Sequence, residues 1–154
     1  MRSVFFFATL ALASVLFADA SSVPKGFESV DQVIKLGVVP GRMLFDKDKL
    51  TVKAGQKIKI EFKNNGVMPH NLLVLKSGGD TNKVGQMAMG LGANGAKMGY
   101  VPQSEHILAS VKMINAKQSG SLYFKAPEVA GSLPYVCTFP GHFMMMKGVI
   151  TVSK

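Results

Sequence analysis

The chain has 154 residues, a length that suits a single domain. Its formal net charge is +9, with lysines densest between residues 47 and 63, so its surface could steer it toward an acidic protein or an anionic membrane face. The single cysteine, Cys137, excludes a disulfide within the chain, and the lack of a recognisable nucleic-acid-binding motif argues against a nucleic-acid partner.

The first twenty residues have the pattern of a secretory signal peptide. Arg2 supplies the positive charge, residues 4–17 are almost continuously apolar, and residues 18–20 read Ala-Asp-Ala, an A-x-A cleavage site. The apolar run is shorter than the roughly 20 residues that a membrane-spanning helix needs, which favours cleavage over an uncleaved anchor. We therefore predict a signal peptide at residues 1–20, export to the periplasm or secretion, and a mature domain at residues 21–154.

The mature chain is patterned mostly as β-strand. The clearest example is residues 57–63, where Ile58, Ile60 and Phe62 alternate with charged residues, as in a half-buried strand. The other predicted strands are bounded by turn signals such as Asn-Asn-Gly at residues 64–66. They are residues 33–39, 50–53, 71–75, 107–114, 121–125, 133–137 and 148–153.

Residues 80–103 lack the alternating pattern of the predicted strands. Asp80 could cap a short helix over residues 84–89, and residues 90–99 are glycine-rich and are expected to be irregular. Seven or eight short strands with turn signals between them predict an all-β, antiparallel β-sandwich with this segment as an insertion. Tyr135 is either a tyrosine corner of such a sandwich or an ordinarily packed residue.

The most specific chemical signal lies at residues 137–148, which read Cys-Thr-Phe-Pro-Gly-His-Phe-Met-Met-Met-Lys-Gly. Thiolate, imidazole and thioether groups are soft or borderline ligands that suit copper better than calcium or magnesium. Pro140 and Gly141 form a turn that would fold the segment back on itself. Two imidazoles and one thiolate with a weak axial thioether suit a copper ion that shuttles one electron. His70, from a different strand, is the candidate for the second imidazole.

Each candidate ligand also has an alternative role. Cys137 could be a buried inert thiol, an intermolecular bridge or a nucleophile, and His70 could be a hydrogen-bonded structural histidine. Met146 could fill the core, with Met144 and Met145 competing for the axial position. Spacing within the loop favours Met146.

Further histidine and methionine residues lie outside this pattern. His106 lacks the context of a ligand, and we expect it to be exposed. Met87, Met89 and Met98 in the insertion could form a copper-loading patch or could pack as core or lid residues.

The sequence at these positions resembles the cupredoxins, the small type 1 blue copper proteins, and is most similar to azurin and azurin-like domains. The similarity rests on Cys-Thr-Phe-Pro-Gly-His at residues 137–142, Met-Lys-Gly at 146–148, and the His-Asn pair at 70–71. It implies a Greek-key sandwich with one type 1 copper per chain. The implied ligands are His70, Cys137, His142 and Met146.

The resemblance also implies supporting roles. Asn71 would bridge the two ligand segments near Thr138, and backbone N–H groups of Asn71 and Phe139 would donate to the Cys137 sulfur. The chain departs from azurin in lacking a disulfide. It also has Pro69 where azurin has a glycine whose carbonyl approaches the copper. Because proline fixes φ near −65°, a second axial contact from that residue is in doubt.

The expected function is electron transfer without enzymatic activity, through an exposed edge of His142. An apolar collar around that ring would form the docking patch; its predicted members are Met68, Pro69, Phe139, Pro140, Phe143 and Met144. We expect a monomer without stable membrane insertion. The expected partners are redox proteins of the c-type cytochrome, oxidase or dehydrogenase class, with acidic surfaces as one option.

Two other functions compete with electron transfer. A periplasmic copper carrier or storage protein is supported by the ten methionines. An enzyme would use Cys137 as nucleophile and His142 as base, but no upstream residue is an obvious orienting group, and a copper nitrite reductase would need a second domain.

Overall fold

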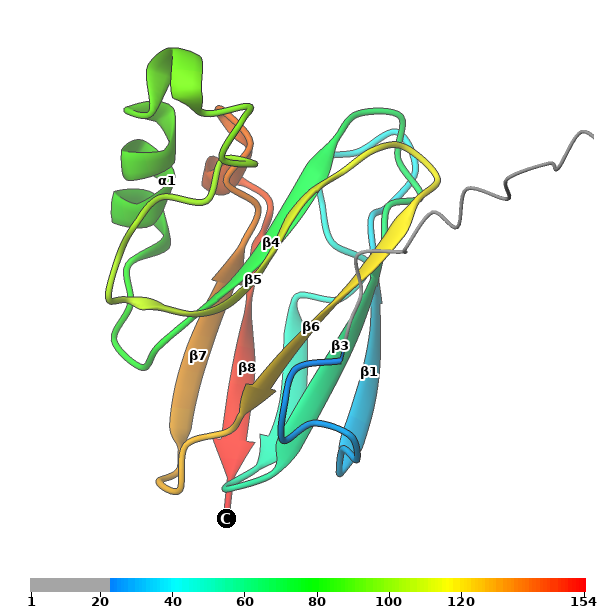
Figure 1. Ribbon diagram of the computed structural model, residues 1–154, viewed down its shortest axis with the longest axis vertical. Helices are drawn as coiled ribbons and strands as arrows, with labels where there is room; N and C mark the ends of the chain where they lie inside the picture. The colour runs from blue at the N-terminus through cyan, green and yellow to red at the C-terminus, as the bar shows by residue number, and fades with distance from the viewer. Residues whose placement is uncertain (1–22) are drawn as a thin grey trace, which may run out of the picture.

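The computed structural model describes residues 23–154 and shows two β-sheets packed face to face (Figure 1). The expected signal peptide at residues 1–20 lies outside the described residues. One sheet has three strands, in the order β1 (Gln32–Gly37), β3 (Lys57–Lys63) and β6 (Ser119–Lys125). The other has five strands, in the order β2 (Lys49–Lys53), β8 (Lys147–Ser153), β7 (Gly131–Val136), β4 (His70–Leu75) and β5 (Ile107–Ile114).

The predicted sandwich of seven or eight strands is confirmed, but its sheets are mixed and not wholly antiparallel. Strand β1 runs parallel to β3, and β2 runs parallel to β8. The remaining pairings are antiparallel. Parallel neighbours need long connections that pass through other elements, so local turn signals could not reveal these two pairings.

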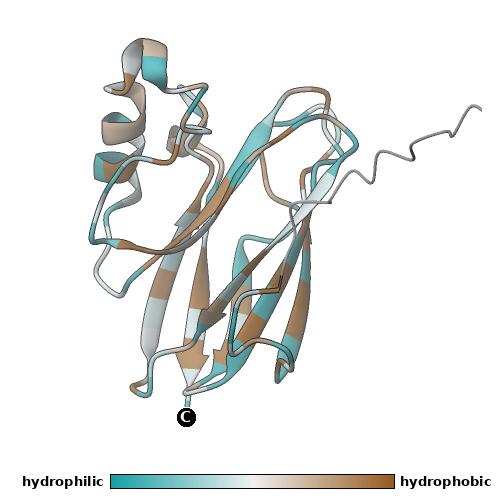
Figure 2. Cartoon of the chain, viewed as in Figure 1, coloured by the Kyte–Doolittle hydropathy of each residue, from teal (hydrophilic) through white to brown (hydrophobic). Residues whose placement is uncertain are grey.

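The core between the sheets comes from alternating strand residues. Ile58, Ile60 and Phe62 are fully buried, while the charged residues between them face outward. Figure 2 shows this alternation as bands of apolar and polar residues along the strands. Strand β4 differs because all six of its residues are buried, so it must be covered on both faces.

The insertion covers the outer face of β4. Helix α1 (Thr81–Met89) stands beside the five-stranded sheet (Figure 1). Its Val84 packs with Leu73 and Leu75 in a second apolar cluster, whereas Leu72 and Val74 of the same strand belong to the main core. The side chain of Asp80 accepts hydrogen bonds from the N–H groups of Asn82 and Lys83, so the predicted cap is confirmed.

The rest of the insertion is mostly irregular, as expected, with one short 3-10 helix, η1 (Gly92–Asn94). A second 3-10 helix, η2 (His142–Met144), lies between β7 and β8. Within residues 23–154, no helix has the length and apolar character needed to cross a membrane.

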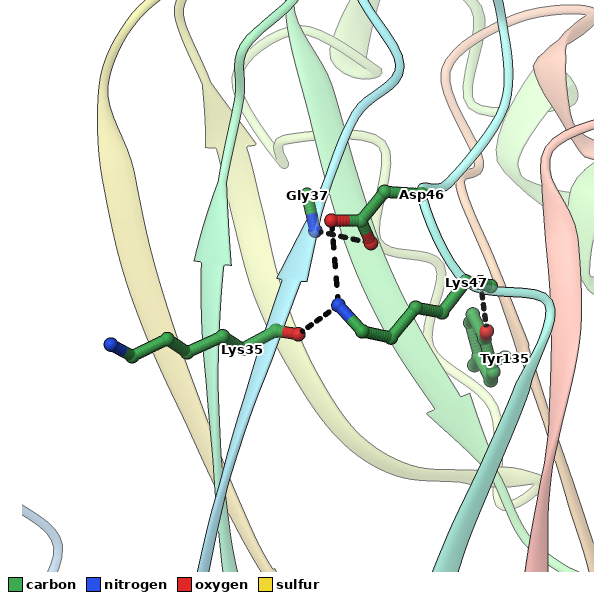
Figure 3. A network of polar contacts seen from close by, with 5 residues as sticks. All are labelled: Lys35, Gly37, Asp46, Lys47 and Tyr135. Atoms are coloured by element: carbon green, nitrogen blue, oxygen red, sulfur yellow. Dashed lines mark hydrogen bonds and ion pairs between the residues drawn. The ribbon is translucent and has the colours of Figure 1, made fainter.

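Tyr135 ties β7 to the chain before β2, as Figure 3 shows. Its hydroxyl donates a hydrogen bond to the Lys47 carbonyl, and burial raises the pKa of the phenol. The bonded carbonyl is distant in sequence, so this contact is not a tyrosine corner, in which the hydroxyl bonds backbone a few residues upstream.

The same segment is also held to β1 (Figure 3). The Asp46 carboxylate accepts from the Gly37 N–H at 2.9 Å, and the Lys47 ammonium donates to the Lys35 carbonyl at 2.8 Å. These contacts fix the loop between β1 and β2 against the sandwich.

Candidate metal centre

The four predicted ligands come from separate elements that meet at one end of the sandwich. His70 is the first residue of β4, Cys137 directly follows β7, His142 begins η2, and Met146 directly precedes β8. Three of them form a buried group whose ligand atoms lie within 4.8 Å of one another. It is the one group of three or more metal-ligating His, Cys, Asp or Glu side chains found among the described residues.

Backbone hydrogen bonds shape the loop that carries three of these residues. The His142 N–H donates to the Phe139 carbonyl at 2.9 Å, and the Met146 N–H donates to the His142 carbonyl at 2.8 Å. The Cys137 N–H closes the loop by donating to the Met146 carbonyl at 3.0 Å. Gly141 has a φ of +81°, a conformation that glycine adopts without the steric cost of a side chain. The loop is therefore built as a closed turn.

The ligand atoms have the spacing of a trigonal metal site. The Cys137 Sγ lies 3.8 Å from the Nδ1 atoms of both His70 and His142, and these two nitrogens are 3.2 Å apart. Bonds of about 2.3 Å to sulfur and about 2.0 Å to nitrogen, the lengths found for zinc, would give S–N separations of about 3.7 Å and an N–N separation of about 3.5 Å at 120°. The three residues therefore fit a first-row metal ion without rearrangement.

Burial distinguishes the three consecutive methionines. Met146 is fully buried and packs in the same core cluster as Cys137, whereas Met144 and Met145 are 63% and 59% exposed. A thiolate, two imidazoles and a thioether form the donor set that soft copper sites use. Burial and loop position thus favour Met146 over its neighbours as the thioether ligand.

Burial also sets the protonation of the ligands. It lowers the pKa of His70 to about 4, with a further contribution from His142, and it lowers the pKa of His142. Burial raises the pKa of the Cys137 thiol to about 11, opposed by the backbone N–H groups of Asn71 and Phe139. Both imidazoles are therefore neutral and ready to bind a metal, while the thiolate needs a cation to form.

Asn71 bridges the two ligand segments, as the sequence analysis predicts. Its Oδ1 accepts from the Thr138 N–H at 2.7 Å, and its Nδ2 donates to the Thr138 Oγ1 at 2.8 Å. The network also extends into the insertion, which was not foreseen. Nδ2 donates to the Gly99 carbonyl at 2.9 Å, and the Thr138 hydroxyl donates to the Tyr100 carbonyl at 2.6 Å.

A second supporting residue, Asn64, was missed by the sequence analysis. Its Nδ2 donates to the carbonyls of Met68 and Ile114 at 2.8 and 2.9 Å, and its Oδ1 accepts from the Gly66 N–H at 3.0 Å. These bonds fix the turn that leads into His70. The Asn-Asn-Gly motif signalled the turn but not this buried role.

The predicted apolar collar needs correction at Phe143, and the predicted exposed edge of His142 needs correction too. Phe143 is only 6% exposed because it packs under helix α1 with Val84, and His142 is only 3% exposed. Met68 and Met144 are exposed, as expected. Phe143 and His142 are therefore both buried, contrary to the prediction.

The remaining predicted site residues have mixed surroundings. Pro140 is exposed, while Pro69 and Phe139 are half-buried. The Phe139 ring lies 4.6 Å from the His142 ring, measured between centroids. His106 is half-buried, not exposed as expected, and lies outside the cluster of ligands.

Comparison with known proteins gives consistent matches. A family model described as copper binding proteins, plastocyanin/azurin family, matches residues 32–153. Auracyanin-A of Chloroflexus aurantiacus is 35% identical over 78% of this chain and 74% of its own length. Azurin-1 of Alcaligenes xylosoxydans xylosoxydans is 33% identical over 70% of this chain and 88% of its own length. The structure of reduced auracyanin from Roseiflexus castenholzii superposes with a TM-score of 0.72 at 31% identity, covering 82% of this chain and all of that one.

Proposed function

Because the chain belongs to the plastocyanin/azurin family of copper-binding proteins, we propose that it carries single electrons between redox partners. Copper is its cofactor, and cycling between Cu(I) and Cu(II) would supply the chemistry. We assign the ligands to His70, Cys137, His142 and Met146.

The spacing and burial of the ligand atoms carry this proposal. The ligand atoms of His70, Cys137 and His142 already lie 3.2–3.8 Å apart, and burial keeps both imidazoles neutral. Hydrogen bonds from Asn71 to the loop resist movement of these side chains. A site that rearranges little when its charge changes suits electron transfer.

The closed site supports a carrier over an enzyme. Cys137 and Met146 are fully buried, and the two histidines are 3% exposed. A substrate would have little access to the Cys137 sulfur. Electrons, unlike substrates, can cross a thin layer of packed protein, so a closed centre is compatible with exchange between proteins.

The exposed apolar residues near the loop are the proposed docking patch, which we define as Met68, Pro140 and Met144. A small apolar surface allows close but transient approach by a partner. The net charge of +9 would speed the encounter with an acidic partner more than it would strengthen binding. The proposed partners remain redox proteins of the c-type cytochrome, oxidase or dehydrogenase class, and we propose that the protein is an exported monomer.

Redox cycling tests the proposal against a copper carrier. The copper-loaded protein should pass through repeated reduction and oxidation by small reagents without releasing copper to a chelator. Release of copper in the reduced state would favour the carrier function instead.

A charged substitution tests the docking patch. Met144→Glu should slow electron exchange with a redox partner and leave the visible absorption unchanged, because Met144 is exposed and is not a proposed ligand. Met89→Glu is the matched control, because Met89 is also exposed, at 52% against 63% for Met144, and lies on helix α1. Equal exchange rates for wild type and both variants would exclude the patch.

A further inference from the structure

A surface pocket of about 300 Å³ lies beside the proposed copper centre, and His70 forms part of its wall. Three methionines line it: Met43, Met68 and Met145. None of the three is a proposed copper ligand. We call this pocket, defined by these three residues, the methionine pocket.

The three methionines reach the pocket from three separate loops. Met43 lies between β1 and β2, Met68 lies in the turn before β4, and Met145 lies between η2 and β8. They are 43%, 41% and 59% exposed, respectively. Because about half of each side chain stays exposed, none of the three methionines is a core residue, and burial accounts for only part of their position.

Local hydrogen bonds hold the backbone of each methionine in place. The Met43 loop is closed by the Val39 N–H, which donates to the Leu44 carbonyl at 2.9 Å. The Met68 carbonyl accepts from Asn64 Nδ2 at 2.8 Å, and the Met145 N–H donates to the His142 carbonyl at 3.0 Å. The backbone of each methionine is therefore fixed at the pocket, while the three side chains that line it remain accessible to solvent.

The chemistry of the pocket matches Cu(I). Thioether sulfur is a soft, neutral donor that selects Cu(I) over harder ions. The exposed residue Arg42 also lines the pocket, and its positive charge keeps the affinity for a cation low. A weak site of this kind suits transfer of an ion and not its storage.

The proposed copper centre is buried, and the pocket beside it offers an incoming ion a route to the ligands. The ligands of the centre are at most 3% exposed, so an incoming ion needs a route to them. His70 belongs both to the centre and to the pocket wall. Gly66 also lines the pocket, and a Cβ at this position would lie 3.3 Å from His70 Nε2, so the lack of a side chain at Gly66 keeps the space beside the His70 ring free.

We propose that the methionine pocket is an entry site that binds Cu(I) and passes it to the copper centre past His70. The inference rests on the proposed ligand set of that centre. No electron moves in this transfer: the bonds from the thioethers to Cu(I) break, bonds to His70 and Cys137 form, and the Cys137 thiol releases its proton to solvent.

Binding of a second Cu(I) ion tests the proposal. The protein is loaded with one copper, reduced without oxygen, and titrated with Cu(I) against a colorimetric Cu(I) chelator of low affinity, because the pocket is a weak site. Wild type should bind one further ion. The variant Met43→Leu/Met68→Leu/Met145→Leu should lose it, because leucine conserves volume and apolarity but has no sulfur.

Exposed methionines on helix α1 provide the matched control. Met87 and Met89 are 36% and 52% exposed and do not line the pocket, so Met87→Leu/Met89→Leu should bind the second ion like wild type. Cu(I) should load the metal-free triple variant about tenfold more slowly than it loads wild type. A tenfold change corresponds to a loss of about 1.4 kcal/mol in the binding free energy of Cu(I) at the entry site. Met145→Leu alone, a substitution at the most exposed position, should slow loading in the same direction.

Three results would overturn the proposal. The first is that wild type binds no second Cu(I) ion. The second is that the triple variant binds the second ion as wild type does. The third is that the helix variant Met87→Leu/Met89→Leu loses the second ion. Failure of the proposed copper centre is distinguishable, because wild type would then give no blue absorption with the first equivalent of Cu(II).

Discussion

Replacing Gly85 with alanine tests how helix α1 packs on the ligand loop. A Cβ at Gly85 would clash with Phe143 Cγ and would lie 2.5 Å from both Cδ atoms, and Phe143 is only 6% exposed. Because interiors are close-packed, the ring or the helix must move. Overpacking of this kind costs about 1–3 kcal/mol, while alanine improves helix propensity by up to about 1 kcal/mol. With the full propensity gain, we expect a net loss of up to about 2 kcal/mol in the free energy of unfolding.

Gly90→Ala is the matched control at the end of the same helix. Gly90 has φ −65° and ψ −11°, which alanine adopts without strain, and a Cβ there would lie 3.4 Å from its nearest neighbour. This variant should gain about 0.4–1 kcal/mol. Urea unfolding of the metal-free proteins measures both changes. Equal stability of the two variants would refute the close contact between Gly85 and Phe143.

The same pair of variants reports on the copper centre. Phe143 directly follows His142, so displacement of its ring should disturb the histidine that precedes it. The copper-loaded Gly85→Ala variant should show a shifted visible band and altered copper hyperfine splitting, and Gly90→Ala should match wild type. Identical spectra for all three proteins would mean that helix α1 does not influence the centre.

Asn71→Leu leaves buried partners in the ligand loop and the insertion without hydrogen bonds. At about 1–3 kcal/mol per unpaired group, the free energy of unfolding of the metal-free protein should fall by several kcal/mol. An unchanged midpoint of urea unfolding would contradict this. The metal-free protein should lose stability as pH falls from about 6.5 to about 4. An unfolded histidine takes up a proton near pH 6.5, whereas the low pKa of folded His70 keeps it neutral down to about pH 4. A free energy of unfolding that stays constant over that range would argue against buried neutral imidazoles. Met146→Leu should raise the reduction potential, since the weak thioether ligand is lost, whereas Met144→Leu should leave it unchanged. If redox titration shows that only Met144→Leu changes the potential, Met144 is the thioether ligand.

Much of the sandwich is predictable because strand periodicity is local. The alternation at residues 57–63 predicts β3 with the bounds that the structure shows. Strand ends are less predictable, because they depend on a distant partner. Strand β7 begins at Gly131, two residues before its apolar pattern starts, because Gly131 pairs with Val152 of β8.

The candidate ligands are predictable because the loop has a specific order of soft donors. Their surroundings depend on the insertion, which has no simple periodicity. Phe143 looks like a surface residue in sequence because nothing near it indicates that α1 covers it. The carbonyls of Gly99 and Tyr100 that bond Asn71 and Thr138 are backbone groups, and their positions cannot be read from side-chain identity.

The methionine pocket shows the same limit. Met43, Met68 and Met145 are far apart in sequence, and none lies in a motif of its own. Only the fold brings them together beside His70. The sequence left Met87, Met89 and Met98 of the insertion as either a copper-loading patch or core and lid residues, and Met87 and Met89 lie on α1, outside the pocket.

Titration of the mature protein with Cu(II), followed by visible absorption and EPR, tests the central claim most directly. A centre built by His70, Cys137, His142 and Met146 predicts an intense charge-transfer band that saturates at one copper per chain, with narrow copper hyperfine splitting. The band requires the thiolate, so it should be absent in Cys137→Ser. A colourless copper complex of the wild-type protein, or a band that survives in Cys137→Ser, would contradict the account.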